Sequence, residues 1–214
     1  MKEKGIDFKK YDKIYKREGV MTKGGGWKGS YGDDPTLDKK WDRYGHACEG
    51  KPNFSDVVGL QPKSMIDIGC GHNEFLGLIK KSYNDKISLL GVDIACPSAD
   101  LIAPAHKIPI KNSSYDMLVS FDCMEHIPEE EVKPSYKEFA RVADRIYIKI
   151  SLTHSKTRID EEPLHVCIKS KDWWLKASQQ YFPNASIVRN DRPGTIWESI
   201  TIYGDNRNNK KEDF

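Results

Sequence analysis

Apolar runs of strand length recur along the chain from residue 64 onward, separated by stretches in which apolar residues follow helical spacing. The runs predict strands at Ser64–Ile68, Ile87–Asp93, Asp100–Ala103, Tyr115–Phe121, Arg145–Ile150, Ala185–Asn190 and Trp197–Tyr203. The intervening stretches predict helices at Glu74–Lys81, Pro128–Val142 and Ser170–Phe182. Ser170 should cap the last helix, and Pro134 should bend or break the second. This alternation predicts a three-layer α/β fold, a mostly parallel seven-stranded sheet with an antiparallel closing strand and helices on both faces.

The first 60 residues are predicted to form an N-terminal arm and lid, part of the same domain as a core at 61–204, with a polar tail at 205–214. Apolar spacing in residues 1–20 predicts a short amphipathic helix with a lysine-rich outer face. A glycine-rich loop follows, in which Trp27 and Tyr31 either close over a ligand or pin a linker to the core. Further helices are expected at Thr36–Gly45 and Asn53–Leu60.

Composition agrees with a globular domain, because hydrophobic residues make up 38% of the 214 positions and charged residues 31%. No apolar run is long enough to cross a membrane, and the polar start lacks the apolar core of a signal peptide. The five cysteines show no CxxC pair and no zinc-binding spacing, which predicts free thiols, a reducing cytoplasmic location and no metal.

Charge is distributed unevenly along the chain. The net charge of +2 argues against a strong polyanion binder. Residues 1–28, however, hold nine Lys and Arg against four Asp and Glu, an excess of five positive charges. The arm could therefore contact nucleic acid, although this partner is not the favoured one.

A glycine turn follows the first predicted strand and leads into a helix, an arrangement in which a ligand approaches the backbone and the helix N-terminus. Asp93 ends the next strand 24 residues after Gly69, the usual distance for a carboxylate that binds ribose hydroxyls. A dinucleotide site would have a third glycine at Glu74, where a carboxylate repels pyrophosphate. The acids Asp67, Glu74 and Asp93 instead suit a ligand with a positive sulfonium, which favours S-adenosylmethionine over NAD.

Four motifs in order resemble those of the class I S-adenosylmethionine-dependent methyltransferases, which have a Rossmann-like fold. Asp67–Gly71 followed by Phe75 resembles the first motif, and Gly91-Val92-Asp93 resembles the second. The segment Lys107–Asp116 is similar to the family's "LPF…SFD" segment, and Ser120–Ile127 to its "LEH" signature. The resemblance covers roughly residues 61–203, in order along the chain.

The resemblance implies roles for individual residues. It assigns the methionine end of the cofactor to Asp67, Gly69, Cys70 and Gly71, the ribose to Asp93, the adenine to Ile94, Ala105 and His106, and the sulfonium side to Phe121 and Asp122. Two positions depart from the family. Asn73 replaces a third glycine but tolerates a left-handed backbone. Pro104 replaces an Asp that recognises the adenine in the family. Recognition of the adenine in this chain is therefore expected from backbone groups, Asp100 or His106.

Methyl transfer to a hydroxyl needs positioning and a base. His126 follows the predicted strand at 115–121, and His154 and His165 follow the strand at 145–150, so all three are candidates for an acceptor site at the carboxyl ends. We expect His126 or His165 to be the base, with Asp122 as a rival, unless these histidines are packed or surface residues. Glu125 is a candidate to orient His126, and Trp27, Tyr31 and His154 are candidates for substrate or lid contacts.

The range of possible methyl acceptors is narrowed mainly by motifs that the sequence lacks. The strand at 115–121 is followed neither by Asn-Pro-Pro-Tyr nor by Pro-Cys, the motifs for methylation of DNA bases. We expect the loop Ser151–Ile168 and the arm to frame a pocket for a small-molecule or saccharide hydroxyl, with S-adenosylhomocysteine as co-product. Methylation of RNA or protein, and a non-catalytic cofactor-binding relative, are the alternatives. The oligomeric state is left open.

Overall fold

The computed structural model of this 214-residue protein describes residues 11, 13, 20–22, 52–155, 157–159 and 161–208. The predicted helix Thr36–Gly45 lies outside these ranges, as does most of the predicted arm helix, of which Tyr11 and Lys13 are described and helical.

The main sheet has seven strands in the order β4-β3-β2-β5-β6-β10-β9. These strands are β2 (Ser64–Ile68), β3 (Ser88–Asp93), β4 (Leu101–Ile102), β5 (Tyr115–Phe121), β6 (Ala143–Ser151), β9 (Ser186–Asp191) and β10 (Ser199–Asp205). The four pairs from β4 to β6 are parallel, and β10 runs antiparallel to both β6 and β9. The predicted mostly parallel sheet with an antiparallel closing strand is confirmed.

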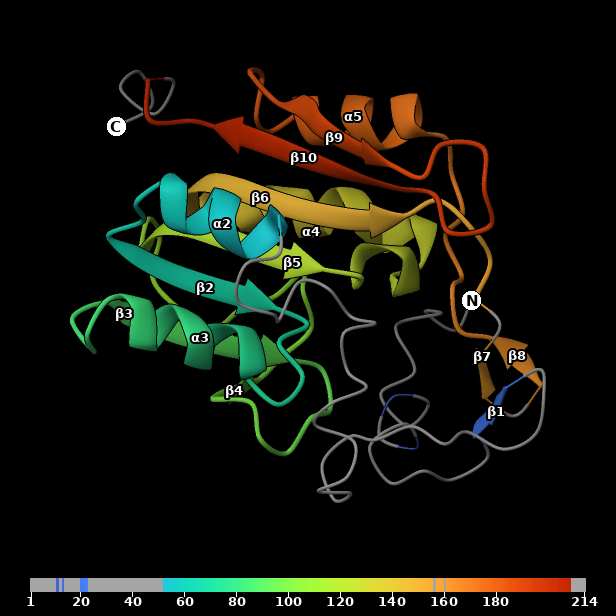
Figure 1. The fold of residues 1–214 in the computed structure, drawn as a ribbon, viewed down its shortest axis with the longest axis horizontal. Helices are drawn as coiled ribbons and strands as arrows, with labels where there is room; N and C mark the ends of the chain where they lie inside the picture. Colours follow the sequence, from blue (N-terminus) through green and yellow to red (C-terminus); the bar gives the residue numbers. More distant parts are fainter. Residues whose placement is uncertain are drawn as a thin grey trace.

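Helices cover both faces of this sheet (Figure 1). On one face, α2 (Pro52–Gly59) and α3 (Glu74–Ser82) bury Phe54, Val57 and Phe75 against the strands. On the other face, α4 (Glu129–Val142) and α5 (Lys171–Gln179) contribute Tyr136, Phe139 and Trp174 to the larger core cluster. Within the described ranges, no helix combines the length and apolar character needed to cross a membrane.

Helix α4 continues through Pro134, so of the two expected effects, a bend or a break, the break does not occur. Proline at this position removes the N–H that would bond to the carbonyl of Glu130, at a cost of about 3 kcal/mol. The apolar face of the same helix buries Val132, Tyr136 and Phe139 completely. Each such side chain contributes about 1.5–3 kcal/mol, so burial outweighs the defect.

A second, smaller sheet occupies the segment predicted as a long loop at Ser151–Ile168. It has the order β1-β7-β8, with β1 at Val20–Thr22, β7 at Thr157–Ile159 and β8 at Glu162–Pro163. The β1 strand of the arm pairs antiparallel with β7, and Val20 lies opposite Ile159. Figure 1 draws this sheet on the side toward which the β5 and β6 arrows point. The arm is therefore joined to the loop that follows β6.

Candidate active site

The turn after β2 has the left-handed backbone that the sequence predicted. Gly69 and Gly71 have φ angles of 75° and 52°, and Asn73 has a φ of 61° and a ψ of 22° as the N-cap residue of α3. The N–H groups of Gly69 and Cys70 donate to the carbonyl oxygen of Val92 at 2.8 and 3.1 Å, which ties the turn to β3. Asn73 thus takes the conformation that a third glycine would supply.

The side chain of Asn73 fits beside β3 only because residue 91 is a glycine. A Cβ atom at Gly91 would lie 1.8 Å from Oδ1 of Asn73, so the asparagine side chain occupies space that only a glycine leaves open. Nδ2 of Asn73 donates to the carbonyl oxygen of Ser98 at 3.0 Å. Gly91 is part of the second sequence motif, but its role as the partner of Asn73 is visible only in the structure.

Two buried acids flank this turn. Asp67 is 3% exposed, and no hydrogen bond or ion pair joins its carboxylate to another described residue. Burial raises the pKa of Asp67 to about 8, and the charge of Asp93 adds to the rise. Such an unpaired acid favours a cationic ligand, so the site fits the ammonium and sulfonium groups of the predicted cofactor.

The carboxylate of Asp93 is hydrogen-bonded to the backbone of the glycine turn and of the segment after β3. It accepts hydrogen bonds from the N–H of Gly71 at 3.1 Å and from the N–H groups of Ala95 and Cys96 at 2.9 Å each. The Asp93 carboxylate, which is predicted to bind the ribose, is therefore held in a fixed orientation by backbone N–H groups.

The predicted adenine residues lie beyond β3 and β4. Ile94 is half-buried, and Ala105 is buried in the larger core cluster. Both side chains proposed to replace the missing acid at Pro104 have protein partners: Nδ1 of His106 lies 3.0 Å from Oε2 of Glu131, and Oδ2 of Asp100 accepts the Gly91 N–H at 2.7 Å. Of the three alternatives for recognising the adenine, backbone groups are the one that does not require a side chain to give up its present partner.

The residues that end β5 are held by neighbours. The ring of Phe121 packs between those of Phe75 and Tyr147, with centroid distances of 4.7 and 6.2 Å. Asp122 has a φ of 51°, and its Oδ1 lies 2.5 Å from Nζ of Lys149. Lys149, near the carboxyl end of β6, was not considered in the sequence analysis. Its ion pair makes Asp122 a weaker candidate for the base than the histidines.

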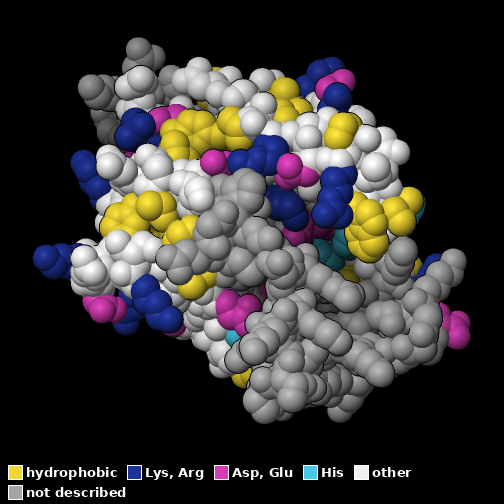
Figure 2. Space-filling view, in the orientation of Figure 1, with side chains coloured by type: hydrophobic (Ala, Val, Ile, Leu, Met, Phe, Trp, Pro, Cys, Tyr) yellow, Lys and Arg dark blue, Asp and Glu magenta, His cyan; other side chains and the backbone are white. Residues whose placement is uncertain are grey.

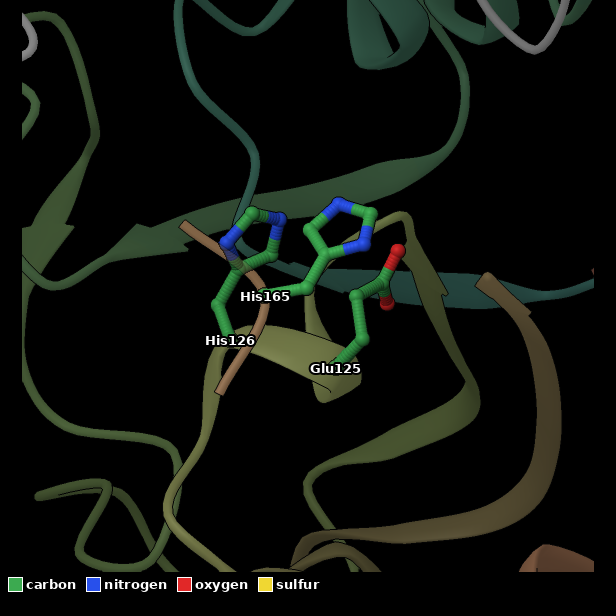
Figure 3. Close-up of side chains that lie close together, drawn as sticks. All are labelled: Glu125, His126 and His165. Atoms are coloured by element: carbon green, nitrogen blue, oxygen red, sulfur yellow. The ribbon is translucent and has the colours of Figure 1, made fainter. Parts of the chain in front are cut away.

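Directly after β5, the 3-10 helix η1 (Met124–His126) brings two histidines together. The carbonyl oxygen of Glu125 accepts the N–H groups of Val166 and Cys167 at 2.9 and 3.0 Å, which holds the later segment against η1. The rings of His126 and His165 meet edge to face, with centroids 4.9 Å apart. Figure 3 shows Glu125 beside this pair.

Both imidazoles are oriented by backbone carbonyl groups. Nδ1 of His126 lies 3.1 Å from the oxygen of Leu164, and Nδ1 of His165 lies 2.6 Å from that of Thr153. A carbonyl oxygen only accepts, so each Nδ1 carries the proton and each Nε2 the lone pair. Burial lowers the pKa of His165, which favours the neutral ring.

Glu125 is fully buried in the same cluster. Its Oε1 accepts the N–H of Ser151 at 3.2 Å, whereas Oε2 has no hydrogen-bond partner in the part of the chain that the structure describes. Burial, followed by the nearby charge of Asp122, raises the pKa of Glu125. Figure 2 shows acidic, basic and histidine side chains gathered on this face, near the carboxyl ends of β5 and β6.

The arm reaches this cluster through Tyr11. The Tyr11 hydroxyl donates to the carbonyl oxygen of His126 at 2.7 Å, and the two rings lie edge to face. The sequence analysis placed Tyr11 on an amphipathic helix without a functional role. A contact across 115 positions leaves no local signal in a sequence.

The other candidates for substrate or lid contacts are His154, Trp27 and Tyr31. His154 is exposed and lines an open depression of about 420 Å³ together with Leu152, Thr153, Gly194, Thr195 and Ile196. Trp27 and Tyr31 lie outside the described residues. The rings of His126 and His165 are in contact, whereas His154 acts on His165 through its charge.

Comparison with known proteins gives partial matches. Residues 66–145 match the family model described as a methyltransferase domain. Norajmaline N-methyltransferase of Rauvolfia serpentina is 26% identical over 106 residues, which cover 42% of this chain and 36% of that enzyme. The chain thus aligns with about a third of the length of this curated relative.

Solved structures share the fold. The YcgJ protein of Bacillus subtilis has a TM-score of 0.54 at 12% identity, over 71% of this chain and 97% of its own. The PH0226 protein of Pyrococcus horikoshii OT3 has a TM-score of 0.51 at 12% identity, over 80% of this chain and 99% of its own.

The strand order, the covering helices and the glycine turn define a Rossmann-like α/β domain, in which residues 66–145 are similar to a methyltransferase domain.

Proposed function

We propose that this protein transfers a methyl group from S-adenosylmethionine to a hydroxyl group of a small molecule or saccharide. One observation carries the proposal. The acid-lined glycine turn after β2 and the histidine pair after β5 lie at the carboxyl ends of hydrogen-bonded parallel strands. A cationic donor and a polar acceptor would therefore meet in one crevice.

The cofactor would be held by the turn residues and by two acids. Asp67 is suited to the ammonium group and Asp93 to the ribose hydroxyls, with Ile94, Ala105 and His106 toward the adenine. The cofactor supplies a methyl carbon that its sulfonium makes electrophilic. The chain would contribute orientation and a dry, anionic surround, which together account for much of the rate of such a reaction.

The acceptor would meet the histidine pair. A neutral imidazole with its lone pair on Nε2 can take the proton that a hydroxyl loses on methylation. The lowered pKa of His165 keeps that ring neutral near pH 7. Lys149 would hold the Asp122 carboxylate in place on the same side of the site.

Calorimetry with S-adenosylmethionine tests the cofactor assignment. Asp93→Ala should weaken binding by about 100-fold, because two charge-assisted hydrogen bonds of about 1.5 kcal/mol each are lost. Asp93→Asn keeps an oxygen for the N–H groups of Ala95 and Cys96 but places an NH2 group opposite the Gly71 N–H, so it retains only part of the backbone bracing. Asp85→Asn, in an exposed turn, serves as the control. Unchanged affinity in Asp93→Ala would refute the ribose assignment.

An acceptor screen with labelled methyl donor tests the reaction. Sugars, hydroxylated small molecules, amines, RNA and protein are offered separately; amines are included because the relative from Rauvolfia serpentina is named an N-methyltransferase. Transfer to RNA or protein alone would contradict the proposed acceptor class, and cofactor binding without any transfer would favour a non-catalytic relative.

The same assay tests the histidines. His126→Ala or His165→Ala should lower turnover by about 100-fold while cofactor affinity changes little, because a general base contributes about that much. Wild-type turnover in both variants would exclude either histidine as the base.

A further inference from the structure

We propose that Glu125, His126 and His165 form a binding site for a divalent first-row transition metal. One nitrogen of each imidazole and one oxygen of the Glu125 carboxylate all lie within 4.8 Å of one another. Figure 3 shows the three side chains gathered at η1 and the segment that packs on it. His126 and His165 are 39 positions apart in the chain, so no metal-binding spacing marks the site in the sequence.

The two imidazoles are arranged as metal ligands usually are. Each donates its Nδ1 proton to a backbone carbonyl oxygen, that of Leu164 or that of Thr153. Such a bond fixes the tautomer, directs the Nε2 lone pair toward a ligand position and holds the ring plane. The backbone thus provides the outer shell of contacts that a metal-binding histidine needs.

Glu125 supplies the independent observation. The residue is 0% exposed, and Oε2 has no hydrogen-bond partner among the described residues, although Oε1 accepts the Ser151 N–H. A buried carboxylate oxygen without a partner is costly, and a cation is a common way to satisfy it. The nearby cation Lys149 is paired with Asp122.

The donor set indicates which ions fit. Two imidazole nitrogens and one carboxylate oxygen suit Mn²⁺, Fe²⁺, Co²⁺ or Zn²⁺ better than Ca²⁺ or Mg²⁺, which prefer oxygen ligands. Bonds of about 2.1 Å require the three ligand atoms to close by about 1 Å, which small side-chain rotations supply. Three protein ligands leave coordination positions for water or for an acceptor oxygen.

This inference deepens the proposed function but does not rest on it, because the cofactor-free chain should bind the ion. It changes the role of the two histidines, whose Nε2 atoms would serve as ligands instead of accepting the acceptor's proton directly. Metal binding and methyl transfer can therefore be tested separately.

The test uses the full chain without an affinity tag, after treatment with a chelator. Co²⁺ titration followed by visible absorption, and equilibrium dialysis with Mn²⁺ and Zn²⁺, should show one ion per chain. His126→Ala, His165→Ala and Glu125→Gln should each weaken binding by about tenfold or more. Glu125→Gln keeps an acceptor for the Ser151 N–H, which guards against a folding defect. His154→Ala removes an exposed histidine of the same loop and should leave metal affinity unchanged.

Absence of stoichiometric binding by the wild type would overturn the proposal, as would equal affinity in the wild type and the three variants. Circular dichroism on the same samples reports whether the fold is intact, and S-adenosylmethionine calorimetry reports cofactor binding separately. A chain that binds the ion but not the cofactor would refute the proposed function and leave the metal site standing. A chain that binds the cofactor and transfers methyl groups but binds no ion would refute the metal site and leave the proposed function standing.

Discussion

At the scale of single residues, the glycine turn shows what a sequence can and cannot reveal. The tolerance of Asn73 for a left-handed backbone follows from its residue type alone, and the observed φ of 61° confirms it. The dependence of Asn73 on Gly91 joins two strands and needs coordinates. The sequence analysis did not foresee the burial of Glu125 or the ion pair of Lys149, because burial and ion pairing are properties of the folded chain.

Gly91→Ala should lower the free energy of unfolding by about 1–3 kcal/mol and weaken cofactor binding, because the new Cβ meets Oδ1 of Asn73 at 1.8 Å. The double variant Gly91→Ala with Asn73→Gly should recover much of the loss, since glycine keeps the left-handed turn without the amide. Gly77→Ala, in the open interior of α3, should be neutral or stabilising. Urea denaturation measures all three, and strictly additive effects in the double variant would contradict the clash.

At the scale of elements, strand and helix positions were predicted to within a few residues, because strand length and helical spacing are local signals. The β1-β7-β8 sheet was not predicted. Its strands have three, three and two residues, and β1 pairs with a segment more than 130 positions away. The helix predicted at Pro128–Val142 is not broken at Pro134, because burial against the sheet outweighs the defect there.

The cap of α5 offers a test at this scale. Oγ of Ser170 accepts the N–H of Trp173 at 3.2 Å, as the sequence predicted. Ser170→Ala should lower the free energy of unfolding by about 1 kcal/mol, and Ser170→Asp should largely preserve it. Ser82→Ala, which removes an exposed hydroxyl at the end of α3, is the matched control and should have a smaller effect. Equal stability of Ser170→Ala and the wild type would show that burial of Trp174 alone holds the helix.

At the scale of the whole molecule, the two ends of the sheet differ in chemistry. Among the described residues, the carboxyl ends hold two carboxylate groups without hydrogen-bond partners, those of Asp67 and of Glu125 at Oε2, and the left-handed backbone of Asp122. The amino ends hold a satisfied network, in which Arg145 makes two bonds to Asp116 and a third to the carbonyl oxygen of Leu60. The buried charges at the amino ends are thus paired.

The network of Arg145 and Asp116 predicts a pH-dependent loss of stability. Burial acts to raise the pKa of Asp116, but hydrogen bonds from Arg145 and from the Lys63 N–H hold it below its usual value. The carboxylate therefore stabilises the fold above pH about 4, and its contribution disappears as pH falls through the lowered pKa. At pH 7, Asp116→Asn should lower the free energy of unfolding by about 3 kcal/mol, because Arg145 is only 3% exposed and would lose its partner. The exposed pair of Lys80 and Asp85 is the control, and Asp85→Asn should cost less than about 1 kcal/mol. Urea titrations at pH 7 and pH 3 measure both, and a deficit in Asp116→Asn that persists unchanged at pH 3 would contradict the assignment.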